Sequence, residues 1–419
     1  MRVLWTVNTF NQKVANIVGT KSSHAISWVE AMGDYLSKSG NVCLAIAAPC
    51  ELSELVKSKI DDVIYYAVPS NEKSWREVIA DFQPDLIHEY GTEKFHNLIV
   101  CNVANDIPVL VSLQGILSEY QRHYYAGIDM STILRYSPIR DWIRPSGFIT
   151  GRMDFKKRSK NEIQLLKKVA FVEGRSTWDR VAALKINQSL KYFFCPRMLR
   201  RSFNESSAWD INDIERHTIL ISQGNYPIKG MHFAFMAVSA LKSKYPDVKL
   251  IVTGSNIFSN IDGWQRILKT GYVRYLYDLA KKLNIFNNIH FTGYEEASGM
   301  AQLLRKSHVA VIPSAIENAP NSLAEAMMIG TPCIASYVGG NMDMLNHNEE
   351  GFLYCYNEPY MLAEYIRQIF ESDELAIKFS KCARKTAMKR HNPISLVDRL
   401  LGIYDDICLE YYGANNGGH

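Results

Sequence analysis

Short runs of apolar, β-branched residues alternate along the chain with longer segments in which apolar residues recur every three or four positions. The short runs predict strands, and the longer segments predict amphipathic helices. A helix is predicted over residues 22–40, ending at Gly40. In the first half the predicted strands cover residues 2–7, 41–48, 62–68, 84–90 and 108–113. This alternation indicates strand–helix–strand units and a parallel sheet.

The pattern starts afresh in the second half, after a polar, aperiodic stretch at residues 200–216 that reads as a linker. Predicted strands, with helices between them, cover residues 218–225, 248–255, 288–294, 309–314 and 331–336. The predicted fold class is therefore α/β, with two Rossmann-like, doubly wound parallel-sheet domains facing an interdomain cleft. We predict domains at 1–200 and 201–390, followed by a final helix and a disordered tail within 391–419.

The composition is compatible with this predicted fold and limits the possible partners and the cell compartment of the protein. The chain has 419 residues and a net charge of +4, too mild to predict a nucleic-acid partner. Its apolar stretches are too short to span a bilayer, and its first residues read as a strand instead of a signal peptide. The eight cysteines show no metal-binding spacing. We expect a cytoplasmic protein with reduced thiols.

Several common sites are absent from the sequence. Neither half carries G-x-G-x-x-G after its first strand, which argues against a dinucleotide-binding dehydrogenase, and no G-x-x-x-x-G-K-[ST] motif occurs. No D-x-D follows a predicted strand. We therefore predict neither a catalytic metal nor a cofactor.

Two glutamates eight positions apart are the first candidates for chemistry, Glu317 in a predicted loop and Glu325 in a predicted helix that ends at Gly330. The structural alternative is that Ser322 and Glu325 form a capping box, with Glu317 a solvated loop residue. Lys229 starts a helix after the first strand of the second half. A lysine beside a helix N-terminus favours a diphosphate, and neighbouring carboxylates accept hydrogen bonds from sugar hydroxyls. These residues together predict a nucleotide-sugar site.

The spacing Glu317-x7-Glu325, followed by Gly330-Thr-Pro332, resembles the E-x7-E region of the retaining glycosyltransferases of family 4, which have the GT-B fold. "YPIKG" around Lys229 is similar to the family's donor-phosphate segment, and "PDLIHEYGTE" resembles its D-x-x-H-x-H stretch. The resemblance covers nearly the whole chain. It implies a metal-independent hexosyltransferase that uses a nucleotide-diphosphate sugar, most often a UDP-sugar, and whose final helix returns to the N-terminal, acceptor-binding domain.

The resemblance also implies roles for individual residues. Glu325 would bind the nucleotide ribose, Glu317 the hydroxyls of the donor sugar, and Lys229 the leaving diphosphate. Gly19 would let the first loop approach the phosphate or the acceptor. The remaining donor-binding positions are Gly254, Tyr294, Ser314, Asn318, Ala319, Pro320 and Asn321.

Two departures from the family pattern stand out. Gly224 occupies the position of a common arginine, so a positive charge on the diphosphate is missing or comes from elsewhere, for example from residues 197–201. Gln114 replaces a common histidine, and it can hydrogen-bond the sugar but cannot act as a base. His88 is a second candidate catalytic residue, with a structural role as the alternative.

Residues 135–168 carry ten Lys and Arg against three Asp and Glu, with interleaved aromatic residues. This composition favours an anionic membrane surface or a lipid-linked glycan acceptor, as in bacterial surface polysaccharide biosynthesis. The alternative is a solvated loop and surface helix. Rival functions for the whole chain are a GT-B epimerase, a phosphorylase-like enzyme, and a degenerate, non-catalytic transferase-like subunit.

Overall fold

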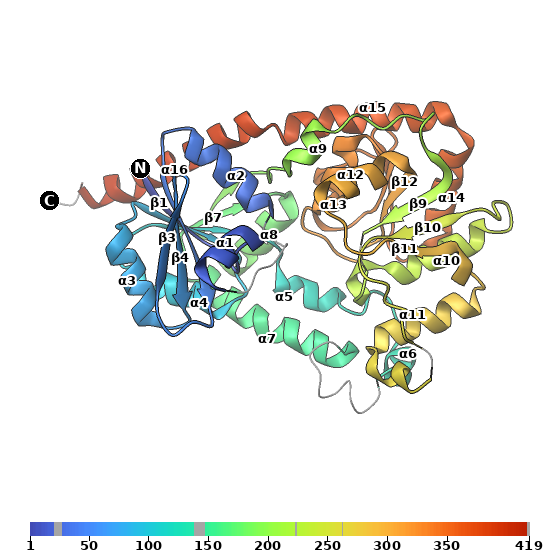
Figure 1. The fold of residues 1–419 in the computed structure, drawn as a ribbon, viewed down its shortest axis with the longest axis horizontal. Helices are drawn as coiled ribbons and strands as arrows, with labels where there is room; N and C mark the ends of the chain where they lie inside the picture. The colour runs from blue at the N-terminus through green and yellow to red at the C-terminus, as the bar shows by residue number, and fades with distance from the viewer. Residues whose placement is uncertain (21–26, 138–146, 223, 262, 417–419) are drawn as a thin grey trace. The chain divides into compact units, whose positions relative to one another are not determined.

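The computed structural model describes the whole chain except residues 21–26, 138–146, 223, 262 and 417–419 (Figure 1). The chain divides into two compact units. The first contains residues 1–118, 157–200 and 391–419, and the second contains residues 119–156 and 201–390. This division differs from the predicted domains at residues 119–156, which we assigned to the N-terminal domain but which belong to the second unit.

The described residues of the first unit contain an eight-stranded sheet with the order β3-β4-β2-β1-β5-β6-β7-β8. Only its edge strand β3 is antiparallel to its neighbour within this described part of the chain. β3 was missed because its sequence, VKSKI, is partly exposed and half polar, as an edge strand should be. The strands are β1 Arg2–Thr6, β2 Cys43–Cys50, β3 Val56–Ile60, β4 Val63–Pro69, β5 Leu86–Tyr90, β6 Val109–Ser112, β7 Phe171–Gly174 and β8 Lys191–Phe194.

Helices cover both faces of this sheet, and alternation along β1 decides which residue faces which core. Trp5 faces the core that contains Leu400 and Tyr404 of the final helix, whereas Leu4 faces the core that contains Trp75 and Val172. The helices are α1 Gln12–Val18, α2 Ser27–Lys38, α3 Glu72–Phe82, α4 Phe95–Val103, α8 Thr177–Ile186 and α16 Pro393–Asn416. Figure 1 shows α16 running alongside α2.

The final helix is longer than the sequence suggested. We predicted disorder from Gly413 onward, but α16 continues through Gly413 to Asn416. Residues 417–419 of the predicted tail lie outside the described residues.

The described residues of the second unit contain a six-stranded parallel sheet with the order β11-β10-β9-β12-β13-β14. From β9 the chain builds outward in one direction to β11 and then returns to β12 on the other side of β9. The topological switch point therefore lies between β9 and β12. The strands are β9 Glu215–Ile221, β10 Lys249–Val252, β11 Ile289–Phe291, β12 Ser307–Ile312, β13 Cys333–Ser336 and β14 Gly351–Tyr354.

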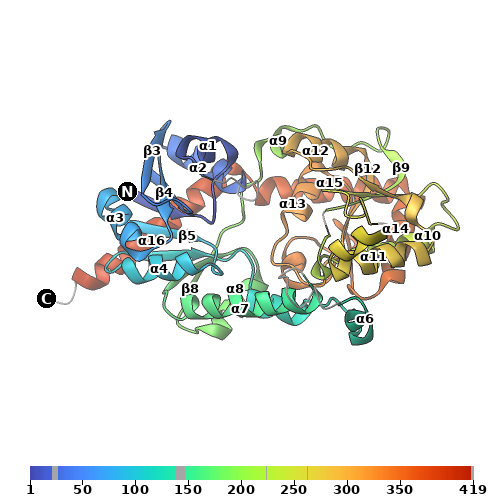
Figure 2. The same ribbon diagram turned by 60° about the horizontal axis from the view of Figure 1, so that its bottom comes forward.

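The helices of the second unit include α6 in the segment 119–156, and Figure 2 shows this helix next to α11. The longer helix α7, Phe148–Leu166, is divided between the two units after Lys156. The other helices are α6 Met130–Arg135, α9 Arg201–Glu205, α10 Met231–Leu241, α11 Gly271–Lys282, α12 Ala297–Lys306, α13 Asn321–Ile329, α14 Pro359–Glu371 and α15 Asp373–Arg390.

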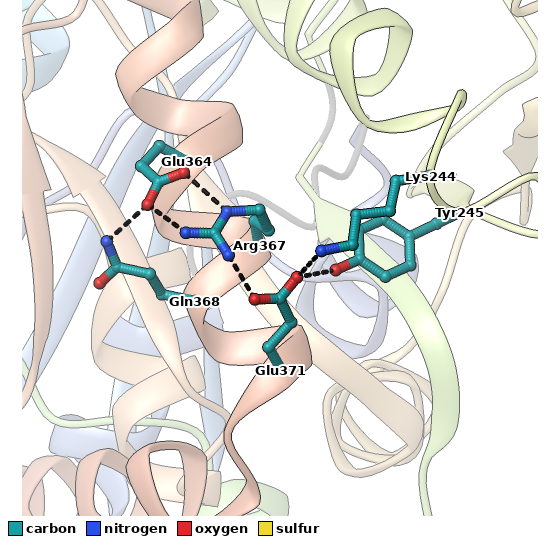
Figure 3. Close-up of polar contacts among 6 residues, drawn as sticks. All are labelled: Lys244, Tyr245, Glu364, Arg367, Gln368 and Glu371. Atoms are coloured by element: carbon teal, nitrogen blue, oxygen red, sulfur yellow. Dashed lines mark hydrogen bonds and ion pairs between the residues drawn. The ribbon is translucent and has the colours of Figure 1, made fainter.

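A charged network connects the end of α10 to α14 (Figure 3). The Arg367 guanidinium donates to Glu364 at 2.8 and 2.6 Å and also to Glu371, which accepts in addition from Lys244 and Tyr245. These groups lie at the surface, where water and salt screen charge. The network therefore links the turn that follows α10 to α14 and contributes little to the stability of the fold.

Glu89 on β5 is a buried acid with an unusual environment. It is 0% exposed, and within the described residues neither of its carboxyl oxygens makes a hydrogen bond of normal geometry. Burial raises the pKa of Glu89 well above its ordinary value, and the Asn97 amide offsets this only in part. The folded protein therefore holds Glu89 protonated at a pH where the unfolded chain has already released that proton.

We expect Glu89→Gln to stabilise the protein at alkaline pH. The native state binds the extra proton, so the free energy of unfolding falls by up to about 1.4 kcal/mol per pH unit from about pH 4.3 up to the raised pKa. Glutamine has no proton to lose, so denaturant unfolding at pH 5 and pH 8 should show a smaller pH slope. The exposed Glu77→Gln is the matched control. Equal slopes in wild type and Glu89→Gln would contradict the prediction.

Candidate active site

The two loops that meet at the switch point of the second sheet carry the principal candidates. After β9 the chain enters a short 3-10 helix, Pro227–Lys229, which ends at Gly230 in the left-handed conformation. After β12 it forms the loop that contains Glu317 and then starts α13. Because β9 and β12 are parallel neighbours, their carboxyl ends place Lys229 and Glu317 at the same edge.

Lys229 and Glu317 form an ion pair in which Nζ contacts Oε1. The same oxygen accepts a hydrogen bond of 2.8 Å from the hydroxyl of Ser314. The side chain of Glu317 is 8% exposed and that of Lys229 is 27% exposed. Three residues that the sequence assigned to the donor site are therefore in direct contact, and the Lys229 side chain among them is partly exposed.

Backbone contacts hold the Glu317 loop between its neighbours. The amide of Ala315 donates to the carbonyl of Ile228 at 2.7 Å, and the amide of Gly340 donates to the carbonyl of Glu317 at 3.0 Å. A Cβ at Gly230 would lie 1.9 Å from the carbonyl oxygen of Pro313, and one at Gly339 would lie 1.8 Å from that of Glu317. Both glycines have positive φ. Larger residues cannot replace them without moving the loop.

Several nearby groups shift the pKa of Lys229. Burial works to lower the pKa of Lys229, but the Glu317 carboxylate, Tyr226 and Tyr120 act in the opposite direction and outweigh it, so the pKa is raised. Lys229 is therefore a stable cation at neutral pH. A fixed ammonium at the mouth of two parallel-strand loops is suited to binding an anion.

Glu325 lies one turn into α13 and is 8% exposed. Its helix begins at Asn321, with Pro320 at the N-cap and no capping hydrogen bond from a side chain. The capping-box interpretation is therefore wrong, because Ser322 lies inside the helix instead of at its cap. Gly330 does end the helix, in the left-handed conformation.

The loop between Glu317 and α13 is largely enclosed. Asn318 is 1% exposed and Pro320 is also buried, whereas Ala319 and Asn321 are half-buried. Helix N-termini carry partial positive charge, so the start of α13 adds to the positive potential of Lys229.

Two other predicted positions lie together, beside strands β10 and β11. Gly254 and Gly293 exchange backbone hydrogen bonds of 2.7 and 3.1 Å, which joins the loops that follow these strands. Tyr294, the next residue, is 61% exposed. Tyr294 therefore lies at the same edge of the sheet as the loops that follow β10 and β11.

His88 is placed in the core of the first unit, so the prediction of a catalytic role is not supported by its position. It is 0% exposed, its Nδ1 lies 2.7 Å from the Tyr404 hydroxyl, and its Nε2 lies 3.1 Å from Oε2 of Glu173. Trp5 donates to the same hydroxyl at 2.9 Å, which leaves the Tyr404 proton for His88. His88 therefore takes part in a buried network that ties α16 to the sheet, the structural alternative considered above.

The other first-unit candidates have local roles that their backbones explain. Gly19 is the left-handed C-cap of α1, a helix that the sequence analysis missed. Gln114 follows β6, is half-buried, and accepts a hydrogen bond of 2.7 Å from Arg175 through its backbone carbonyl. Their predicted contacts with a substrate stay predictions.

The position where the family commonly has an arginine is crowded. Gly224 is buried, and a Cβ there would lie 3.0 Å from Cε of Met231. Met231 occupies space that a longer side chain at position 224 would need.

Three residues that support the Glu317 loop were not found from the sequence, namely Ser336, Gly339 and Asn341. The Ser336 hydroxyl donates to the Ser314 carbonyl at 2.5 Å, and Asn341 donates to Ser336 at 2.9 Å. The paired glycines at 339–340 were the available signal.

Among the described residues, no three His, Cys, Asp or Glu side chains are grouped so that they could hold a metal ion. None of the described helices combines the length and the apolarity needed to cross a membrane.

The chain is similar in sequence to glycosyltransferases. Residues 205–386 match the profile of the family described as Glycosyl transferases group 1. The chain is 30% identical over 196 residues to YtcC of Bacillus subtilis (strain 168), covering 46% of each protein. It is 28% identical over 129 residues to N-acetyl-alpha-D-glucosaminyl L-malate synthase of Bacillus anthracis, covering 31% of this chain and 33% of that one. The chain thus aligns with about half or less of these relatives.

Solved structures extend the likeness to the whole fold. Sucrose-phosphate synthase from Thermosynechococcus elongatus superposes with a TM-score of 0.71 at 15% identity, covering 97% of this chain and 99% of that one. Anabaena HepE in complex with UDP-glucose superposes with a TM-score of 0.66 at 15% identity, covering 97% and 100%. The fold is GT-B, as the sequence analysis predicted. Residues 205–386 of the chain thus resemble the glycosyl transferases group 1, the family whose profile they match.

Proposed function

We propose that this protein is a retaining glycosyltransferase that moves a sugar from a nucleotide-diphosphate donor, most simply a UDP-sugar, to a hydroxyl of a glycan or lipid-linked acceptor. The observation that carries the proposal is the Lys229–Glu317 pair at the switch point of the second sheet, with Glu325 on the helix that follows. A cation and two carboxylates at one edge suit a ligand that has both phosphates and hydroxyl groups.

Each of the three charged residues then binds a different part of the donor. Lys229 and the start of α13 bind the diphosphate, Glu317 accepts hydrogen bonds from the sugar hydroxyls, and Glu325 does the same for the ribose. The joined loops at Gly254 and Tyr294 line one side of the proposed pocket for the nucleotide base. HepE, which shares the fold, has been solved with UDP-glucose, and this supports UDP as the nucleotide to test first.

The proposed reaction is attack by an acceptor hydroxyl on the same face of the sugar from which the diphosphate leaves. The C–O bond to the diphosphate breaks as the new glycosidic bond forms, and a donor phosphate oxygen takes the proton of the acceptor. Lys229 and the loop amides stabilise the charge that develops on the leaving group. NMR of the product tests retention, since an inverted anomeric configuration would contradict it.

The acceptor side of the proposal rests on the basic segment 135–168. Its described part includes exposed cations on α7, namely Arg152, Lys156, Lys157 and Lys160, and two more directly after the helix, Lys167 and Lys168. Such a row attracts anionic lipid headgroups and lipid-linked precursors of a bacterial surface polysaccharide. Co-sedimentation with vesicles that contain anionic lipid tests this part, and binding that is independent of lipid charge would exclude it.

The donor site is tested by thermal unfolding with UDP, GDP, ADP and TDP. A nucleotide present at 100 times its dissociation constant should raise the free energy of unfolding by about 2.7 kcal/mol. We expect one of the four to stabilise wild type and the control Glu349→Ala, whose side chain is exposed, but to stabilise Glu325→Ala much less. Equal stabilisation of Glu325→Ala and wild type would remove Glu325 from the site. No stabilisation by any nucleotide would favour the degenerate-subunit alternative.

A further inference from the structure

The first sheet has a topological switch point of its own, distinct from the one that carries Lys229 and Glu317. From β1 the chain builds outward through β2 to β3 and β4, and it then returns to β5 on the other side of β1. Ligands of open parallel sheets bind at such a reversal, outside the carboxyl ends of the strands. A second ligand is therefore expected at the loops that follow β1 and β5, both of which belong to the first unit.

These two loops bring together the side chains of Asn8 and Glu93. Thr6 of β1 pairs in register with Glu89 of β5. Two residues further on, Asn8 and Gly91 therefore occupy matching positions in the two loops. Nδ2 of Asn8 donates to Oε1 of Glu93 at 3.3 Å. An amide and a carboxylate from different loops thus meet at the switch point.

Gly91 makes this contact possible because it lacks a side chain. A Cβ at Gly91 would lie 3.2 Å from Nδ2 of Asn8 and 3.2 Å from Oε2 of Glu93, closer than such atoms usually approach. Its φ of 119° is also one that residues with a side chain rarely adopt. Any other residue at this position would crowd the amide and the carboxylate.

Helix α7 fixes the loop that carries Glu93. The hydroxyl of Thr92, a residue that is 1% exposed, donates to Oε2 of Glu162 at 3.2 Å. Asn161 donates to the backbone carbonyl of Glu93 at 3.4 Å. The backbone N–H of Thr92 donates to Oε2 of Glu93 at 3.0 Å. The loop and its carboxylate are therefore in place before a ligand binds, which lowers the entropy lost on binding.

The Glu93 carboxylate keeps its charge and part of its capacity to accept hydrogen bonds. The groups that donate to it are neutral, namely the Asn8 amide and the Thr92 N–H, and the residue is half-buried. A carboxylate accepts about four hydrogen bonds, so these two leave a position on each oxygen. Two neighbouring hydroxyl groups of a sugar match such a pair of oxygens, whereas a phosphate would be repelled.

The orientation of Asn8 serves the carboxylate and does not serve the stability of the fold. Oδ1 of Asn8 is buried and, among the described residues, makes no hydrogen bond. A buried oxygen without a partner is destabilising, and it calls for an explanation. Turning the amide over would place this oxygen against the Glu93 carboxylate, which would repel it. The amide is therefore held in the orientation that directs its N–H to Glu93.

We propose that Glu93 binds the acceptor by accepting hydrogen bonds from two neighbouring hydroxyl groups of a sugar, and that Asn8 is the positioning residue that orients its carboxylate. The inference rests on the proposed function and adds to it the part of the first unit that recognises the acceptor. It also restricts the acceptor, because the sugar bound at Glu93 must be uncharged. Anionic groups of a lipid-linked acceptor then lie away from this carboxylate.

The test titrates the full-length chain separately with UDP and with the methyl glycosides of glucose, galactose and N-acetylglucosamine, followed by NMR. We expect wild type to bind at least one glycoside and Glu93→Gln to bind it about tenfold more weakly, the usual effect of weakening hydrogen bonds to a charged group. UDP binding should stay unchanged, because its proposed site lies in the second unit. Glu77→Gln, which alters an exposed carboxylate of the same unit, is the matched control.

The two titrations distinguish failure of this inference from failure of the proposed function. Equal glycoside binding by Glu93→Gln and wild type would overturn the inference and leave the donor site intact. The same conclusion would follow if wild type bound UDP but none of the glycosides. A wild type that bound neither would refute both, and glycoside binding that depends on Glu93 without any UDP binding would refute the donor site alone.

The role of Asn8 is tested by a double-mutant cycle. Asn8→Ala should weaken glycoside binding about threefold, and adding it to Glu93→Gln should weaken binding little further, because Asn8 acts through that carboxylate. The midpoint of denaturant unfolding should not fall, since the change also removes the unpaired oxygen. Additive losses of affinity, or a lower midpoint with unchanged glycoside binding, would show that Asn8 does not position Glu93.

Discussion

Replacing Glu317 by glutamine is expected to lower the transfer rate about 100- to 1,000-fold, comparable to the loss of a preorganised contact in an active site, while UDP binds more tightly. The two effects differ in sign because of the ion pair. In this structure Lys229 is held by Glu317, so a diphosphate must displace that carboxylate. Glutamine keeps the shape of the side chain but carries no charge, so it does not hold the Lys229 ammonium. UDP can then bind Lys229 without displacing a carboxylate.

The increase in UDP affinity is expected to be about tenfold, the equivalent of about 1.4 kcal/mol. Calorimetric titration with UDP measures it, alongside initial rates with the donor identified by the nucleotide panel. Glu349→Gln serves as the control for loss of an exposed carboxylate in the same unit. If Glu317→Gln lost UDP binding together with activity, Glu317 would contact the nucleotide itself, and the division of roles proposed above would fail.

Replacing Lys229 by methionine is expected to weaken UDP binding about 100-fold and to lower the transfer rate by at least as much, because the leaving diphosphate loses its cation. The change should also destabilise the fold. The Glu317 side chain is only 8% exposed, and removing its partner leaves a buried carboxylate at a cost of about 3 kcal/mol. Denaturant unfolding measures this second effect.

The double variant Lys229→Met with Glu317→Gln separates stability from binding. It should regain much of the lost free energy of unfolding, since no buried charge is left unpaired, but it should not regain UDP binding. Recovery of UDP binding in the double variant would mean that Lys229 serves only to neutralise Glu317. If the double variant lost as much unfolding free energy as the two single variants lose together, the two residues would not interact.

The sequence predicted most of the strands in the two sheets. β12, β13 and the parallel strands around β1 are short apolar runs with turn signals at both ends, so their positions followed from composition. The edge strands β3 and β8 and helix α1 were missed because their burial is partial and their patterns are weak. Strands β7 and β14 were also missed, although both are buried, because each has only four residues. The start of α13 was also misread. A Ser-x-x-Glu spacing predicts a cap, but Pro320 at the N-cap shifts the helix start, and such boundaries depend on a loop that the pattern does not describe.

By itself, the sequence determined the fold class and the chemical character of the site, because parallel strands bring their carboxyl ends to one edge and Lys229, Glu317 and Glu325 each follow or lie next to such an end. Only the tertiary structure decided which contacts these groups make. It placed the Lys229 ammonium on the Glu317 carboxylate, buried His88 against Tyr404, and joined residues 119–137 to α10 through the contact between His232 and the Ala126 carbonyl. These outcomes depend on contacts between residues far apart in the chain, in which burial and directional hydrogen bonds choose the partner, and no local pattern records that choice.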